Sequence, residues 1–168
     1  RNPFINDGPF RSASERQQLP DLSTTGTRAL LALPPGSLGH EYARWFEGWG
    51  LDNQFLASWD PSTPAQRFAY RYAHTHDLLH YVLSYAPYDL SREMEIEAFV
   101  HAQTGGLNHL VFILGLARAL RHQDPQLLKK VPRRLREAPR RGARAENVML
   151  VDWGELLPLP LEEVRRRL

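Results

Sequence analysis

The 168-residue chain is predicted to fold as an all-α protein, a single-domain helical bundle. Three observations favour this class. Apolar residues recur at helical spacing in several segments, and no segment of useful length alternates apolar and polar residues as a strand does. Capping residues, prolines and glycines separate the helical segments. Because 42% of the residues are hydrophobic, the chain can bury one core, so we expect one domain.

The first part of the chain is expected to be an irregular arm, and the rest a helical domain. Residues 1–38 are rich in Pro, Gly, Ser and Thr around one apolar patch at 29–33, which predicts at most one brief helix. The helical domain is expected to comprise residues 39–168. It should begin with a short helix at 40–46, which the glycines that follow would end.

The next helix has the clearest start in the sequence. Ser62 or Thr63 can cap it, and Pro64 suits the first turn of a helix, where the missing N–H costs nothing. An apolar stripe at helical spacing then continues, so the helix is expected to reach about Tyr85.

A turn marked by Pro87 separates this helix from the one that follows. Asp89 or Ser91 can cap the second helix, and Gly105 with Gly106 should end it. Because the connection is short, the two helices are predicted to form an antiparallel hairpin.

The remaining third of the chain is predicted to be helical with interruptions. A strongly apolar helix is expected at 107–121, and a basic segment at 127–144 should be interrupted by Pro132 and Pro139. An extended linker and a short basic helix are expected at the end, over residues 155–161 and 161–168.

Composition excludes several classes of site and partner. The chain has no cysteine, so disulfides and thiolate metal sites are excluded and any metal must be bound by nitrogen and oxygen. The longest apolar stretch is well short of the ~20 residues that a membrane-spanning helix needs, and we expect no secretory signal. The net charge of +2 is small, and aromatic residues are not interleaved with the basic segment, so we expect no nucleic-acid partner.

The densest chemistry of the sequence is the run HDLLH at residues 76–80, followed by Glu93. Successive helical residues rotate by roughly 100°, so His76, Asp77 and His80 should share one face and one turn. Two histidines at i and i+4 with nearby carboxylates are typical ligands of a divalent metal ion, and the hairpin would return Glu93 to His80. These four residues are the predicted metal ligands, with zinc favoured and iron or manganese left open. Asp77 could instead orient a histidine or move protons.

The basic segment after the apolar helix allows two interpretations. It could contact anionic lipid head groups or a phosphate, or it could be a solvated helix face. Its Lys and Arg residues are Lys129, Lys130, Arg133, Arg134, Arg136, Arg140, Arg141 and Arg144.

Residues 28–168 resemble the coenzyme Q (ubiquinone) biosynthesis family, the fourth member of the Coq series. The resemblance rests on the HDxxH motif followed by Glu93, and on blocks around it, which lie at residues 35–39, 42–44, 70–72, 98–99, 103–105 and 148–153.

This resemblance implies an all-helical protein that binds a metal, usually zinc, through residues matching His76, Asp77, His80 and Glu93. It implies an apolar groove for a polyprenyl lipid or quinone precursor, and a role in removing the ring carboxylate of a polyprenyl hydroxybenzoate with hydroxylation at that carbon. Asp77 would then be a catalytic proton relay. The alternatives are a non-catalytic scaffold or lipid-binding organiser of the biosynthetic complex, and a metal-dependent hydrolase.

The resemblance also implies partners and a location. Other coenzyme Q biosynthesis proteins and a membrane surface are the expected partners. Separately from the resemblance, a homodimer through the apolar helices is considered as a further partner. The expected location is cytoplasmic and peripheral on the inner membrane, or the matrix side of the mitochondrial inner membrane in a eukaryote.

Overall fold

The computed structural model describes Phe10 and residues 19–168. These residues form eight α-helices and no β-strand, which confirms the all-α class. The helices are α2 (Thr24–Ala29), α3 (Leu38–Gly48), α4 (Pro64–Val82), α5 (Leu90–Thr104), α6 (Leu107–Gln123), α7 (Pro125–Gly142), α8 (Trp153–Leu156) and α9 (Leu161–Arg167), with two 3₁₀ helices, η2 (Leu30–Ala32) and η3 (Gln54–Ser58).

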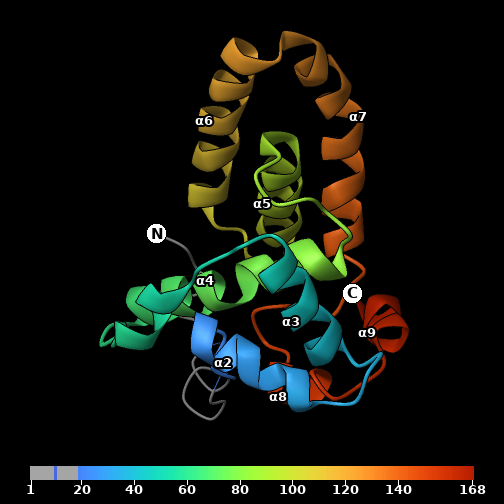
Figure 1. The fold of residues 1–168 in the computed structure, drawn as a ribbon. Helices are drawn as coiled ribbons and strands as arrows, with labels where there is room; N and C mark the ends of the chain where they lie inside the picture. The colour runs from blue at the N-terminus through green and yellow to red at the C-terminus, as the bar shows by residue number, and fades with distance from the viewer. Residues whose placement is uncertain (1–9, 11–18) are drawn as a thin grey trace.

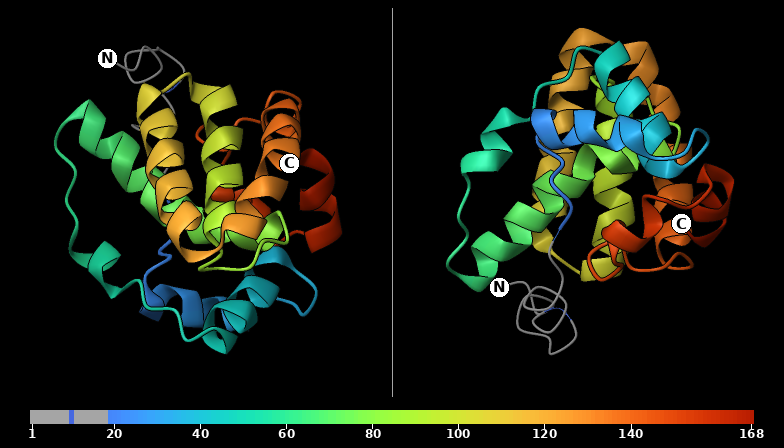
Figure 2. Two further views of the ribbon diagram at one scale, coloured as in Figure 1. Left: turned by 90° about the horizontal axis from the view of Figure 1, so that it is seen from above. Right: turned by 60° about the horizontal axis from the view of Figure 1, so that its bottom comes forward.

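Helix α5 is the central element of the fold. Figure 1 shows α6 and α7 on opposite flanks of α5, rising from a body that contains α2, α3, α4, α8 and α9. The views in Figure 2 show the same arrangement from two other directions. Helix α5 packs chiefly against α6 and α7, and it meets α4 over a short stretch only. The two helices were expected to lie antiparallel along their length, but they cross and meet over a short stretch only. Helices α6 and α7, and not α4, cover most of the contact surface of α5.

Local signals set the start of α4 as expected, but its end differs. Thr63 accepts a hydrogen bond from the Gln66 amide at 3.2 Å, and the Gln66 side chain accepts one from the Thr63 amide at 2.9 Å, which completes a capping box. The helix ends three residues before the expected position. Ser84 there has a φ of 59°, and the Tyr85 amide donates to the His80 carbonyl at 2.7 Å. Helices usually end at a left-handed glycine, so the sequence gives no signal for a helix that ends at a left-handed serine.

The boundaries of α5 follow the predicted capping residues. Asp89 accepts a hydrogen bond from the Ser91 amide at 2.9 Å at the start of the helix. Gly105 ends the helix with a φ of 65°, a conformation that costs glycine little.

Helix α7 runs without a break through Pro132 and Pro139, so the predicted interruption is wrong. Each proline removes one helical hydrogen bond, and close packing against α5 compensates for the loss. The approach is tightest at Gly142, where an added Cβ atom would lie 2.4 Å from the Phe99 carbonyl oxygen. A helix that is marginal by its own sequence is stabilised here by its neighbour.

The hydrophobic core consists of two clusters. The larger one joins the body to one face of α5 and includes Phe10 and Leu22, so the N-terminal part of the chain contributes to it. The smaller one lies between α5, α6 and α7, and its fully buried members are Met94, Leu120 and Val131. Among the described residues, no helix combines the length and the hydropathy that crossing a membrane requires.

Two expectations for the ends of the domain can be compared with the structure. The brief helix expected near residues 29–33 corresponds to α2 and η2. The segment at 155–161 is not an extended linker, because α8 occupies its first two residues and a turn follows. Asp152 caps α8 by accepting from the Gly154 amide at 2.9 Å, which favours a helical turn where an extended chain was expected.

Candidate metal centre

Three side chains from two helices converge beside the crossing of α4 and α5. The Nε2 atom of His76 lies 3.0 Å from Oε2 of Glu93, and the Nε2 atom of His80 lies 2.9 Å from Oε1 of the same carboxylate. One ligand atom from each residue lies within 4.8 Å of the other two, so this group could hold a metal ion. The helical spacing aligns the two imidazoles, and the start of α5 supplies the carboxylate, as the sequence predicts.

The structure places Asp77 outside this group of three. Its Oδ1 atom lies 3.3 Å from Nδ1 of His76, and its Oδ2 atom accepts a hydrogen bond from Nδ2 of Asn53 at 2.6 Å. A carboxylate on the outer ring nitrogen fixes the orientation of a histidine and leaves the other nitrogen for a metal. Of the roles considered for Asp77, the geometry matches the orienting one.

Burial and charge together control protonation at this site. His80 is 1% exposed, whereas the side chains of His76 and Glu93 are 24% and 22% exposed. Burial alone lowers the pKa of His76, but its hydrogen bonds with Asp77 and Glu93 outweigh this effect and raise the pKa to about 10. Burial raises the pKa of Glu93, yet the two histidines lower it to about 2. The pKa of Asp77 is lowered because hydrogen bonds from His76 and Asn53 oppose the effect of burial.

The donor set fits a divalent metal ion. Two imidazole nitrogens and one carboxylate suit zinc, and they also suit iron or manganese. Three protein ligands leave coordination positions open, as catalytic zinc sites do. The Glu93 carboxylate stabilises positive charge near the two imidazoles. In the metal-free protein this charge is a proton on His76, as the raised pKa of His76 indicates. A metal ion would supply that charge in place of the proton.

A second buried polar network lies next to these residues. Glu97 accepts a hydrogen bond from the Tyr72 hydroxyl at 2.6 Å, and its other oxygen lies 2.6 Å from Nδ1 of His109. His109 is completely buried, and the Tyr72 ring contacts the His76 ring edge to face. Tyr72 and Glu97 are each one helical turn from a predicted ligand, so spacing could have indicated them, whereas no spacing in the sequence relates His109 to the motif.

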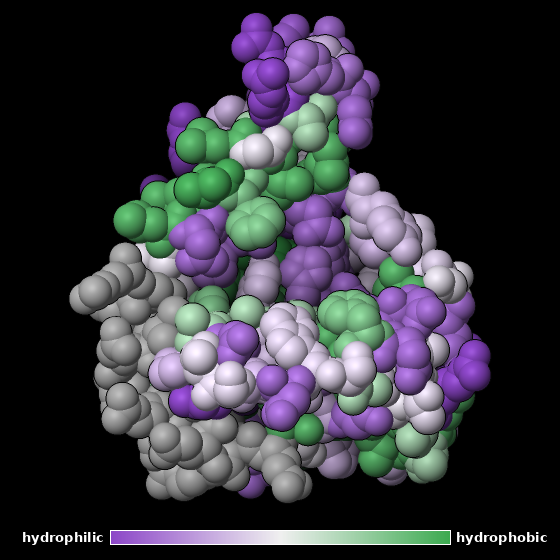
Figure 3. All heavy atoms as spheres, turned by 90° about the vertical axis from the view of Figure 1, so that its left-hand side faces the viewer, coloured by the Kyte–Doolittle hydropathy of each residue, from purple (hydrophilic) through white to green (hydrophobic). Residues whose placement is uncertain are grey.

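An exposed apolar surface covers the outer side of α6. Figure 3 shows hydrophobic residues gathered over this helix, above a hollow in the surface. A shallow cavity of about 450 Å³ lies on the helix and is lined by Asn108, Val111, Phe112, Gly115 and Leu116. Large exposed apolar patches are uncommon on monomeric soluble proteins and mark binding surfaces. The exposed apolar residues of this α6 surface are Leu107, Leu110, Val111, Phe112 and Leu114.

A comparison with known protein families identifies the family of the chain. Residues 14–168 match the family model of the coenzyme Q (ubiquinone) biosynthesis protein Coq4. The chain belongs to the Coq4 family. The matched range spans the candidate metal centre, and the match supports a role in coenzyme Q biosynthesis.

A solved structure supports the fold of this Coq4 chain. The crystal structure of a candidate ubiquinone biosynthesis protein from Nostoc punctiforme superimposes with a TM-score of 0.78 at 20% sequence identity. The alignment covers 99% of this chain and 77% of the other. No curated protein matches the chain.

Proposed function

We propose that this Coq4 chain is a metal-dependent enzyme that removes the ring carboxylate of a polyprenyl hydroxybenzoate and allows hydroxylation at the same carbon. The observation that supports it is the convergence of His76, His80 and Glu93, whose ligand atoms lie within 4.8 Å of one another. His76 and Glu93 are partly exposed, so a substrate could reach the site. Replacing a carboxylate by a hydroxyl is a net oxidation, so an external oxidant such as dioxygen is part of the proposal.

The proposed ligands are His76, His80 and Glu93, with zinc as the first candidate and iron or manganese as alternatives. When bound, such an ion supplies a Lewis acid that binds a carboxylate or phenolate and stabilises developing negative charge. Asp77 positions the His76 ring through its 3.3 Å contact, and Asn53 positions Asp77. In this proposal the Asp77 carboxylate also accepts the proton of the His76 ring nitrogen that faces it.

The α6 surface is the proposed site for the polyprenyl tail. It starts at the end of α5, close to the buried His109, and therefore borders the network beneath the metal centre. An isoprenoid tail would gain ~25 cal/mol for each Å² of apolar surface that both sides remove from water. The same proposal includes three partners of the α6 surface: a membrane surface, other coenzyme Q biosynthesis proteins and a second copy of the chain. It also includes a peripheral location on the inner membrane.

A non-catalytic scaffold is the second candidate, and one observation favours it. The three ligands come from α4 and α5, which otherwise meet over a short stretch, so a metal ion would cross-link two weakly packed helices. An ion with this role would stabilise the fold without turning over any substrate.

The test combines metal analysis, stability and turnover on the same preparations. The chain and its His80→Ala and Asp77→Asn variants are purified without added metal, and a His122→Ala variant serves as the control because His122 is exposed and outside the centre. We expect near-stoichiometric zinc, iron or manganese in the parent and the control, and loss of metal in His80→Ala. Asp77→Asn should keep most of the metal and lose turnover of a prenylated hydroxybenzoate supplied with dioxygen.

Two results would contradict parts of this proposal. Metal in the parent with no turnover in any preparation would favour the scaffold. Equal metal content in His80→Ala and the parent would exclude the centre itself.

A further inference from the structure

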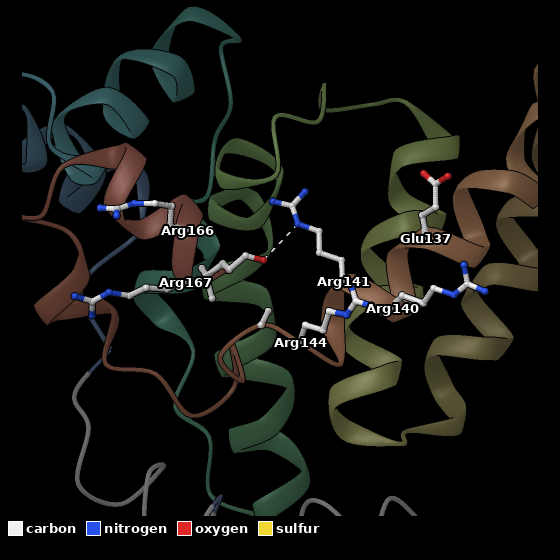
Figure 4. A pocket seen from close by; sticks show the side chains of 8 residues that line it. Glu137, Arg140, Arg141, Arg144, Arg166 and Arg167 are labelled. Atoms are coloured by element: carbon white, nitrogen blue, oxygen red, sulfur yellow. Dashed lines mark hydrogen bonds between the residues drawn. The ribbon is translucent and has the colours of Figure 1, made fainter.

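A cluster of arginines lies away from the metal centre, where the ends of α7 and α9 meet. They line an open cavity of about 370 Å³, and Figure 4 shows the side chains of Arg166 and Arg167 extending to one side of it and that of Arg140 to the other. Its lining residues are Glu137, Arg140, Arg141, Arg144, Ala145, Arg166, Arg167 and Leu168, which we call the arginine pocket. Three of the arginines come from the end of α7 and the turn after it, and two come from the last turn of α9.

The main chain that carries these arginines is held in place by hydrogen bonds. The Gln103 side chain of α5 donates to the Gly142 carbonyl at 2.9 Å and to the Glu146 carbonyl at 3.0 Å. The Glu146 amide donates to the Arg167 carbonyl at 3.0 Å, which joins the turn after α7 to α9. A site whose backbone is already ordered loses less entropy when it binds a ligand.

Acidic residues near the arginine pocket neutralise little of its charge. Glu163 pairs with Arg167, and Glu137 lies 3.4 Å from Arg133, which is outside the pocket. Among the described residues, no Asp or Glu side-chain oxygen lies within 4.0 Å of a guanidinium nitrogen of four pocket arginines, which are Arg140, Arg141, Arg144 and Arg166. Arg141 donates instead to the main-chain oxygen of Leu168 at 3.3 Å.

Helix dipoles explain part of this pattern. Basic side chains in the last turn of a helix are favoured by its partial negative charge, which accounts for Arg140, Arg141 and the arginines of α9. It does not account for Arg144, which lies beyond the Ala143 cap of α7. Nor does it account for the meeting of two such ends around one cavity.

We propose that the arginine pocket binds a phosphate or diphosphate group. The planar guanidinium donates two parallel hydrogen bonds to phosphate oxygens, and arginine is favoured where such groups are recognised. Arg140, Arg144 and Arg166 line one cavity without an Asp or Glu partner, so their long side chains are available to a multiply charged anion, whereas Arg141 already donates to the Leu168 oxygen. The ligand could be a soluble phosphate ester or the head group of an anionic lipid, since both present this chemistry.

The position of the pocket makes the two sources distinguishable. Figure 1 shows α6 on one flank of α5, and α7 with α9 on the other. The α6 surface and the arginine pocket are therefore on different sides of the molecule, so lipid binding through α6 does not depend on these arginines.

The experiment uses two triple variants with the same change in charge. The pocket variant is Arg140→Gln, Arg144→Gln and Arg166→Gln. The control variant is Lys129→Gln, Lys130→Gln and Arg136→Gln, which removes three positive charges from exposed positions of α7 outside the pocket. Circular dichroism confirms that both variants are folded. Sodium pyrophosphate and inorganic phosphate are titrated by calorimetry, and sedimentation is measured with phosphatidylcholine vesicles that contain or lack phosphatidic acid.

We expect pyrophosphate affinity to fall by about tenfold or more in the pocket variant and to change by less than about twofold in the control, since charge-assisted hydrogen bonds are lost only in the first. Selective loss of sedimentation with phosphatidic acid vesicles in the pocket variant would identify a lipid head group as the source. Unchanged sedimentation with the same loss of pyrophosphate binding would identify a soluble phosphate ester. Equal losses in both variants, or no binding of either probe to the parent, would overturn the proposal.

Discussion

Replacing His109 with alanine should destabilise the protein far more than removing an exposed ion-pair partner. The His109 Nδ1 atom lies 2.6 Å from Oε2 of Glu97, and the two side chains are 0% and 8% exposed. In the variant, the Glu97 carboxylate would keep the Tyr72 hydroxyl as its partner in a buried environment, and a cavity would replace the ring. Glu137→Ala is the matched control, because its pair with Arg133 has side chains that are 63% and 87% exposed.

The magnitudes follow from burial. Truncating a fully buried ring leaves a cavity and deprives the buried Glu97 side chain of a hydrogen-bond partner, which together cost ~3–5 kcal/mol, whereas an exposed pair contributes ~0–1 kcal/mol. For a chain of this length, 1 kcal/mol shifts Tm by about 2–4 °C. We therefore expect His109→Ala to lower Tm by about 6–20 °C and Glu137→Ala to lower it by no more than about 4 °C.

Urea and thermal unfolding of both variants, in the presence of a chelator, measure these differences. His109→Gln provides a second check, because its amide can donate to Glu97 and should recover part of the lost stability. A Tm for His109→Ala within about 2 °C of that for Glu137→Ala would refute the reasoning, since it would mean that the buried carboxylate finds a partner without His109.

Two further predictions concern packing and pH. Gly142→Ala should lower the free energy of unfolding by ~1–3 kcal/mol, because the new Cβ meets the Phe99 carbonyl oxygen. Gly115→Ala should raise the free energy of unfolding by up to ~1 kcal/mol, because its Cβ meets nothing within 4 Å, and denaturant unfolding measures both changes. The metal-free protein should be most stable between about pH 4.5 and 6.5, because the contribution of Glu93 is lost as pH falls from 4.5 towards its pKa of about 2, and that of His76 is lost as pH rises from 6.5 towards its pKa of about 10. Tm measured with a chelator should fall below pH 4.5 and above pH 6.5 in the parent protein. The same two slopes in Glu93→Gln as in the parent would contradict the assignment.

The fold could be predicted where local chemistry determines it. Capping by Thr63 and Asp89 and the left-handed Gly105 set helix ends through contacts within a few residues, so the sequence displays them. The end of α4 at Ser84 and the continuity of α7 through its prolines could not be predicted in the same way. They depend on a left-handed serine and on packing between helices that are distant in sequence.

In the candidate site, too, some residues could be predicted from local spacing and others only from the tertiary structure. Helical spacing alone aligns His76 with His80, and a short connection returns Glu93 to them. Asn53 is the residue before the 3₁₀ helix η3, and His109 comes from α6. No periodicity relates these two residues to the motif, so only the tertiary structure identifies them as its neighbours.

The separate cluster between α5, α6 and α7 has a consequence for how the molecule moves. Because Met94, Leu120 and Val131 form a small core of their own, we expect α6 and the part of α7 that faces it to open more readily than the body, while Gln103 keeps the end of α7 joined to α5. Such partial unfolding would appear as faster amide exchange in α6 and α7 than in α3. Met94 follows Glu93 directly on α5, so contacts that hold α6 and α7 closed should also steady the carboxylate at the metal centre.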